Sequence, residues 1–351
     1  MDKKEILQAI EKNQTIENVD ISGIDLSGTD LTGGRFENVC FKGANLRGVK
    51  IRKTGFRNCD FQGAILDEVD FTQVDLRKMN FQNASLKQIK FHMTLLQDTD
   101  MRGANCSGSI FSWLPMQRVK LDRANLSNIK FEKVIMGKAS LKGADFSGSR
   151  LTKVTFNGAN LKGAIFKGVS FLKILFRECD LENQDFRNIN FQQVNADSSN
   201  LQGAIFSGAN ITMSNFQNAN LKKAIFDKAV GEHVMFMSAD LRKAQMQSSC
   251  IPKSYFGQAK LSEADFSKAD LTNCVFEGAD CKLTVFKEAR CQYADFSYAD
   301  LRGADFTKAN LVLARMHLTV EENTKWEGAL KTPIRGVDKE QAEAEKWEPN
   351  I

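Results

Sequence analysis

Large apolar residues recur at every fifth position over most of this chain. Between Ala139 and Phe171 they are Leu141, Phe146, Leu151, Phe156, Leu161, Phe166 and Phe171. The same phase continues from Ile16 to Met316 without an inserted or deleted residue, and all 26 phenylalanines fall on it. Because helices repeat about every 3.6 residues and strands about every 2, a period of five indicates a repeat architecture with its own geometry. These central side chains, with the small residues two positions earlier, are predicted to form the core.

A second period of twenty residues appears when every fourth central residue is compared. One series is Leu121, Leu141, Leu161, Leu181, Leu201, Leu221, Leu241 and Leu261, and another includes Phe146, Phe166, Phe186, Phe206 and Phe226. Like residues are therefore expected to stack on like residues, with four five-residue units in each square coil. At that rate the periodic part of the chain makes about fifteen coils of one continuous solenoid domain.

The units ANLKGAIF (159–166) and ADLRGADF (299–306) resemble the pentapeptide-repeat family of bacterial type, whose motif is A(D/N)LXX. The resemblance covers residues 14–318. It implies an all-β fold, a right-handed quadrilateral parallel β-helix, with the central and minus-two side chains inside and the other three outside. Because the family serves several purposes, the resemblance implies much less about function.

Short helical caps are predicted at both ends of the repeat. Residues 1–13 read as an amphipathic helix, since Asp2 and Glu5 have capping-box spacing, and this helix is expected to cover the open end of the first coil. Residues 319–351 form the predicted C-terminal capping segment.

Two short helices are predicted within that C-terminal segment. Thr319 and Glu322 have capping-box spacing, and Asp338 with Gln341 marks the start of a second helix. Trp326 and Trp347 are candidates to cover the last coil.

Two stretches depart from the repeat. From Phe91 to Val119, Leu114 and Pro115 favour a bulged or bent coil that stays in register; alternatively, outward Met93 and Trp113 form a contact site. Further on, Gly231 occupies a central position that it cannot fill, which predicts a pinch, a kink or a bulge.

The net charge is +5, and the excess of basic residues lies within the repeats. A basic stripe follows the central position on one face: Lys42, Arg102, Lys142, Lys162, Lys222, Arg242, Lys282 and Arg302. Such a stripe could meet an acidic partner or a nucleic-acid backbone. The alternative, which we favour, is that these residues keep the solenoid soluble and protect its sheet edges; no aromatic residues interleave to stack bases, so nucleic acid is not the expected partner.

Apolar residues also occupy outward positions where the motif prefers Asp or Asn. One row contains Ile165, Ile205 and Ile225, and another contains Leu175, Met235, Tyr255 and Val275. Exposed apolar rows often mark contact surfaces, so both are candidate sites for a protein partner or for a second copy in a homodimer. The alternative is that each side chain packs only against its neighbours in the stack.

The sequence offers little for catalysis or ligand binding. It has no phosphate loop, no metal-ligand spacing, and no set of nucleophile, base and orienting residue, so we expect no enzyme, cofactor or metal site. Six cysteines fall on inward phases and only Cys40 and Cys250 point outward, which favours small hydrophobic roles in a reducing compartment. His92, His233 and His317 are all on outward phases. The N-terminus contains no apolar run long enough for a signal peptide or membrane span, and the expected location is the cytoplasm.

These features favour a noncatalytic scaffold or adaptor that binds another protein. A more specific resemblance, to repeat proteins encoded with bacterial type VI secretion systems, would make the chain an accessory or effector adaptor. Some family members resemble DNA in shape and charge and bind type II topoisomerases. That role requires a strongly acidic surface, and the basic balance of this chain disfavours it.

Overall fold

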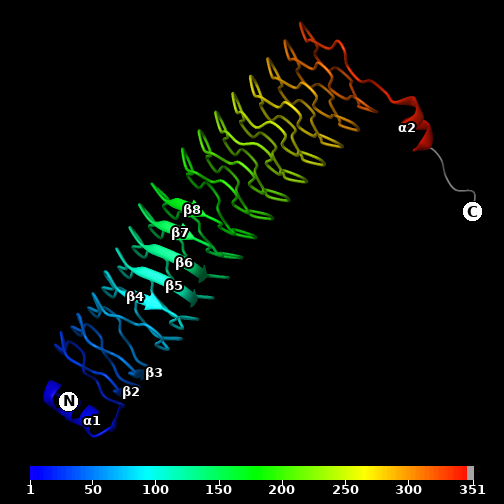
Figure 1. Cartoon of the computed structure of the whole chain (residues 1–351). Coiled ribbons are helices and arrows are strands. Elements are labelled where there is room, and N and C mark those ends of the chain that lie inside the picture. The colour runs from blue at the N-terminus through cyan, green and yellow to red at the C-terminus, as the bar shows by residue number, and fades with distance from the viewer. Residues whose placement is uncertain (346–351) are drawn as a thin grey trace, which may run out of the picture. The chain divides into compact units, whose positions relative to one another are not determined.

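The structure is a computed structural model that describes residues 1–345. It divides into two compact units, Met1–Asp180 and Leu181–Ile351, and each is described by itself. Within both units the chain pairs in parallel with the residue twenty positions later, so each unit is a stack of coils (Figure 1). The predicted all-β parallel solenoid, with few and short helices, is confirmed.

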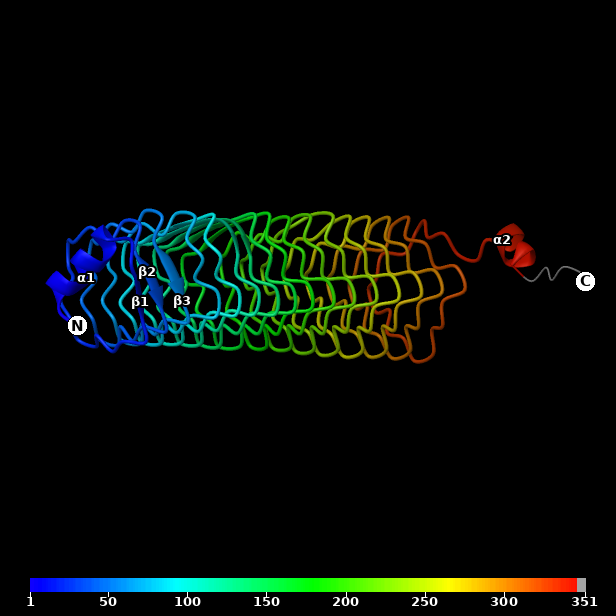
Figure 2. The same cartoon turned by 90° about the horizontal axis from the view of Figure 1, so that it is seen from below.

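Few segments of the coils are long enough to count as strands. In the first unit, helix α1 (Lys3–Glu11) precedes a three-stranded sheet and a five-stranded sheet. The first sheet contains β1 (Thr15–Glu17), β2 (Arg35–Glu37) and β3 (Gly55–Arg57), which lie beside α1 (Figure 2). The second contains β4 (Lys90–His92), β5 (Ile110–Pro115), β6 (Lys130–Ile135), β7 (Arg150–Thr152) and β8 (Ser170–Leu172). The described part of the second unit contains α2 (Lys339–Ala344) and coils joined by single-residue bridges.

The core is built as the period of five predicts. Nearly all central Phe and Leu residues are buried, and so are most of the small residues two positions before them; Phe56 is half-buried. In the first unit the rings of Phe41 and Phe61 stack at 4.8 Å, and in the second unit Phe256 and Phe276 stack at 4.8 Å. Stacking of like on like follows because coils separated by about 4.8 Å bring equivalent side chains into contact.

The polar positions of the motif shape the turns between faces. The carboxylate of Asp25 accepts a hydrogen bond from the backbone N–H of Ser27 at 2.9 Å, as Asp and Asn do in Asx turns. The same turn then closes when the N–H of Thr29 donates to the carbonyl of Leu26 at 3.1 Å. Gly28, between them, has φ +63°, a conformation that favours Gly and Asn. The preference for Asp or Asn, and for Gly or Asn three residues later, therefore has a backbone cause.

The N-terminal helix covers the first coil. Its capping box is complete, since Asp2 accepts from the N–H of Glu5 and Glu5 accepts from the N–H of Asp2. Ile6, a residue of this helix, is fully buried. Ile10 passes so close to Gly34 that a Cβ there would lie 3.3 Å from its Cδ1 atom. A short helix is therefore present at the N-terminal end of the coils, as the capping-box spacing predicted.

The C-terminal prediction was partly wrong. No helix begins at Thr319; instead the coil continues, with Val320 bridging Asp300 and Arg335 bridging Arg315. The capping-box spacing does not produce a helix here, because the twenty-residue register offers the same residues backbone hydrogen bonds to the preceding coil.

Trp326 keeps the central phase and stacks on Phe306 at 4.7 Å, so it does lie over the preceding coil. Helix α2 begins after Asp338, whose side chain accepts from the N–H of Gln341, as predicted. Trp347 lies outside the described residues.

Neither irregular stretch contains a bulge. Leu114 pairs with Val134 and Pro115 with Ile135, so the coil at residues 91–119 stays in register as predicted, and the predicted bulge is absent from this pairing. A longer strand, β5, runs through the corner instead.

At Gly231 the register also continues, because the adjacent Val230 bridges both Asn210 and Cys250. A Cβ on Gly231 would lie 2.8 Å from the backbone nitrogen of Thr212 and 2.9 Å from the carbonyl carbon of Ile211. The coil is therefore pinched there.

Candidate interaction surfaces

The predicted basic stripe is a row of ion pairs. Lys42 lies 3.4 Å from Asp60, and Lys282 lies 3.1 Å from Asp300. Its arginines bind the aspartate two residues earlier, on the same face: in Arg242, Nε and Nη2 donate to the two carboxylate oxygens of Asp240 at 2.8 and 2.7 Å. Lys142 forms no ion pair with any described residue. Most of this stripe is therefore neutralised locally, which leaves little free charge for a phosphate backbone.

The Asp-x-Arg fork occurs at the three arginines of the stripe and at two positions outside it. The pairs are Asp75 with Arg77, Asp100 with Arg102, Asp185 with Arg187, Asp240 with Arg242, and Asp300 with Arg302. Hydrogen bonds from Arg187 lower the pKa of Asp185, and those from Arg302, joined by Lys282, lower that of Asp300 further. Sequence analysis missed this motif, although its two-residue spacing places both side chains outward on one strand segment.

The isoleucine row differs in exposure along the chain. In the first unit, Ile165 is 47% exposed. In the second unit, Ile205 and Ile225 bridge one another on adjacent coils and are only half-buried. Their side chains therefore cover each other in part, as in an ordinary ladder.

The second apolar row presents a larger contact surface. Met235 and Tyr255 bridge one another in the second unit and are 36% and 41% exposed, while Leu175 is exposed in the first unit. Sequence analysis overlooked Met237, two residues after Met235 on the same face, and Met213 at the neighbouring corner, both exposed. We call Met213, Met235, Met237 and Tyr255 the Met–Tyr patch.

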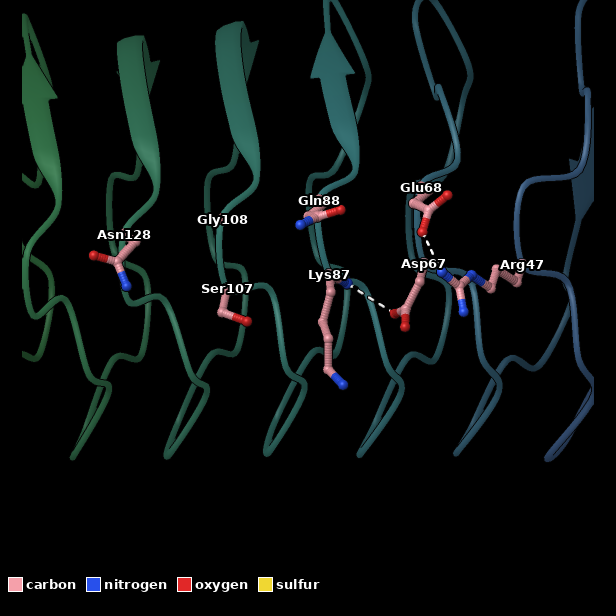
Figure 3. Close-up of a pocket in the computed structure, with 8 residues that line it drawn as sticks. All are labelled: Arg47, Asp67, Glu68, Lys87, Gln88, Ser107, Gly108 and Asn128. Atoms are coloured by element: carbon pink, nitrogen blue, oxygen red, sulfur yellow. Dashed lines mark hydrogen bonds and ion pairs between the residues drawn. The ribbon is translucent and has the colours of Figure 1, made fainter.

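A shallow depression of about 460 Å³ crosses successive coils of the first unit (Figure 3). Its guanidinium and both of its carboxylates form hydrogen bonds with other residues of the lining. Arg47 donates to Glu68 at 2.5 Å, and Asp67 accepts from the backbone N–H of Lys87 at 3.0 Å. The carboxylates of the depression are therefore engaged by hydrogen bonds and are not free to bind a ligand.

The histidine at the C-terminal end was misplaced by sequence analysis. His317 was expected to point outward into solvent, but it is fully buried because α2 folds over it. Its Nδ1 accepts from the N–H of Asp338 at 3.0 Å, and its Nε2 lies 3.4 Å from Glu345. Tyr298 and Gln341 also hydrogen-bond with Glu345, so α2 is attached mainly by polar contacts.

The remaining reactive groups are buried or dispersed. Burial raises the pKa of the Cys59 thiol to about 11 and that of Cys106 to about 12, so neither is a thiolate near neutral pH. Over residues 1–345, no three His, Cys, Asp or Glu side chains lie together as ligands for a metal ion. None of the helices in the same range is long and apolar enough to cross a membrane.

Several solved structures are similar to this chain. HetL, a pentapeptide repeat protein involved in heterocyst differentiation regulation from the cyanobacterium Nostoc sp. strain PCC 7120, is 18% identical over 95% of this chain and 96% of its own, with a TM-score of 0.15. QnrB1, a plasmid-mediated fluoroquinolone resistance protein, is 17% identical over 59% of this chain and 89% of its own, with a TM-score of 0.26. Rfr23 from the cyanobacterium Cyanothece 51142 is 14% identical over 47% of this chain and 92% of its own, with a TM-score of 0.21.

Comparison with curated proteins gives no significant match. Family profiles match most of the repeat. The profile described as a pentapeptide repeat region matches residues 29–111 and 249–325. The profile described as pentapeptide repeats (8 copies) matches residues 136–168, 175–212 and 214–251. Together with the register of five and twenty residues, these matches establish that the chain belongs to the pentapeptide-repeat family.

Proposed function

We propose that this chain is a noncatalytic protein-interaction scaffold. The observation that supports this best is the Met–Tyr patch of the second unit. Met235 and Tyr255 replace the Asp or Asn of the motif, and therefore give up the Asx hydrogen bond without gaining burial in the core. Methionine side chains are flexible and polarizable, and with tyrosine they suit a surface that packs against another protein.

The charged rows are consistent with the same proposal. Their carboxylates and guanidinium groups pair with one another, so they maintain solubility and offer no obvious catalytic pair. Such pairing also argues against a DNA mimic, which needs a surplus of free carboxylates. We place the scaffold in a reducing cytoplasm because most of its cysteines are free thiols packed in the core.

Site-specific photo-crosslinking in the native cell tests the proposal. A benzophenone amino acid replaces Tyr255 in one variant and Lys228, an exposed corner residue on another face, in the control. We expect a discrete adduct from position 255, either with another protein or with a second copy of the chain, and none from position 228. No adduct at position 255, or equal adducts at both positions, would contradict a specific protein contact at the patch.

A further inference from the structure

The five-stranded sheet of the first unit carries a cationic surface that the basic stripe does not include. We define the β4–β8 face as the outward side chains of these strands with the adjoining corner residues Met93, Lys153 and Lys173. Its cations are Lys90, Lys130, Lys133, Arg150, Lys153 and Lys173. Glu132 is the acidic residue among its outward strand positions.

Most of these cations are free of carboxylates, in contrast to those of the basic stripe. Lys90 is paired with Asp70 at 3.4 Å. Within residues 1–345, Lys130, Arg150 and Lys153 form no ion pair, and all three are exposed. Strands in this parallel sheet are spaced by about 4.8 Å, so these cations form a close array whose mutual repulsion a negative partner would relieve.

Apolar side chains lie among the cations on β5 and β6. Ile110 is 41% exposed and sits beside Lys130, its bridge partner on the next strand. Trp113 and Ile135, at the corner where these strands turn, are 53% and 47% exposed. Positive charge and exposed apolar surface therefore coincide here.

The contact between Lys133 and Trp113 favours one class of anionic partner over the others. The ammonium of Lys133 lies 3.3 Å from the centre of the Trp113 ring. It occupies one face of the ring, where a nucleobase would otherwise stack, and it would carry a charge into a bilayer if Trp113 inserted there. A carboxylate can instead pair with Lys133 from the solvent side, while neighbouring apolar groups pack against Ile110 and Ile135.

We propose that the β4–β8 face binds an acidic segment of a partner protein that also contains apolar side chains. This proposal rests on the proposed scaffold function, and it specifies the chemical character of one partner that the scaffold would bind. The surface is separate in sequence and in unit from the Met–Tyr patch.

Fluorescence anisotropy with labelled peptides tests the assignment. The probe is a flexible peptide of glutamate, leucine and glycine, and its controls replace glutamate by glutamine or leucine by serine. We expect only the parent peptide to bind well, with affinity that falls as salt is raised. Combined Lys130→Glu, Arg150→Glu and Lys153→Glu substitutions should weaken binding by about tenfold or more, because each reversal removes an attraction and adds a repulsion.

A matched variant carries the same change of charge in the second unit: Lys223→Glu, Lys228→Glu and Lys308→Glu. It should bind the peptide nearly as the wild type does. An equal loss of affinity in both variants would show that only the net charge matters, and would overturn the proposal. Tighter binding of a thymidine oligonucleotide, or of phosphatidylserine vesicles, would also overturn it.

If the first variant has a much lower melting temperature than the wild type, the variant Lys153→Gln with Lys173→Gln replaces it. The Met235→Asp and Tyr255→Asp variant should bind the peptide normally, because the Met–Tyr patch is not part of the β4–β8 face. If the wild type does not bind the peptide, the β4–β8 proposal is overturned while the scaffold proposal, which rests on the Met–Tyr patch, still stands.

Discussion

At the scale of single residues, the central apolar side chains that point into the core contribute most of the stability of each coil. Phe276 lies between Phe256 and Phe296, with ring centres 4.8 Å away on both sides, and it is fully buried. Its neighbour Glu277 is exposed on the opposite side of the backbone. The period of five predicted this difference, because only one phase of a five-residue unit holds the large apolar residues.

Phe276→Ala should therefore destabilise the second unit by about 3 to 5 kcal/mol through lost transfer energy and a trapped cavity. Glu277→Ala should change its stability by less than about 0.5 kcal/mol. Denaturant unfolding followed by circular dichroism measures both. Comparable losses in the two variants would show that the inward phase had been misassigned.

The Asp-x-Arg forks make stability depend on pH. Arg302 and Lys282 lower the folded-state pKa of Asp300 below its ordinary value of about 3.8. A carboxyl group with a lowered folded-state pKa stabilises the protein above its unfolded pKa, and this contribution disappears as the pH falls through the folded pKa.

Asp300→Asn should accordingly lower the melting temperature at pH 7, and the difference from the wild type should shrink as the pH drops below about 4. Melting curves across this range test the expectation. A difference that stays constant with pH would mean that the carboxylate charge contributes nothing at this position.

At the scale of elements, the coil around Gly231 shows that the register prevails over local defects. The residue lacks the side chain that its position calls for, yet the backbone closes toward Thr212 and Ile211 instead of inserting a bulge. Sequence analysis located this defect but left three outcomes open, since the choice depends on how the neighbouring coil fills the space.

Gly231→Ala should destabilise the second unit by about 1 to 3 kcal/mol, because the new Cβ would overlap the neighbouring backbone. Gly137→Ala is a matched control in the first unit, where the nearest atom to an added Cβ is 3.7 Å away. Thermal unfolding of the two variants gives the comparison, and equal tolerance of both would argue against the pinched coil.

Helix α2 marks where sequence analysis failed. Asp338 and Gln341 correctly predicted its start, but nothing local indicated that Gln341 and Glu345 would reach back to Tyr298 and bury His317. Contacts between residues far apart in sequence are visible only when the fold brings them together. The β4–β8 face was not overlooked for this reason, because Ile110, Lys130 and Arg150 lie twenty residues apart and the predicted register already placed them side by side.

At the scale of the whole molecule, different positions of the repeat determine the fold and the function: inward and turn residues determine the fold, and outward residues are available for function. Inward residues and turn residues follow the motif so closely that the fold class could be predicted from the period and the family motif. Outward residues are free to vary, so the row containing Met235 and Tyr255 could be proposed as a site, but the exposure of each of its side chains could not be predicted. The ion pairs of Arg242 and Arg302 also explain why a basic composition does not by itself create a nucleic-acid site.

The central claim is that the protein acts by contact through its exposed apolar side chains. The most direct measurement compares the wild type with the Met235→Asp, Tyr255→Asp variant, both for association with whatever crosslinks at position 255 and for melting temperature. The scaffold account predicts that association falls by about tenfold or more, since central apolar contacts dominate interfaces, while melting changes little. Undiminished association would contradict the account, and a large fall in melting temperature would show that the patch serves the fold instead.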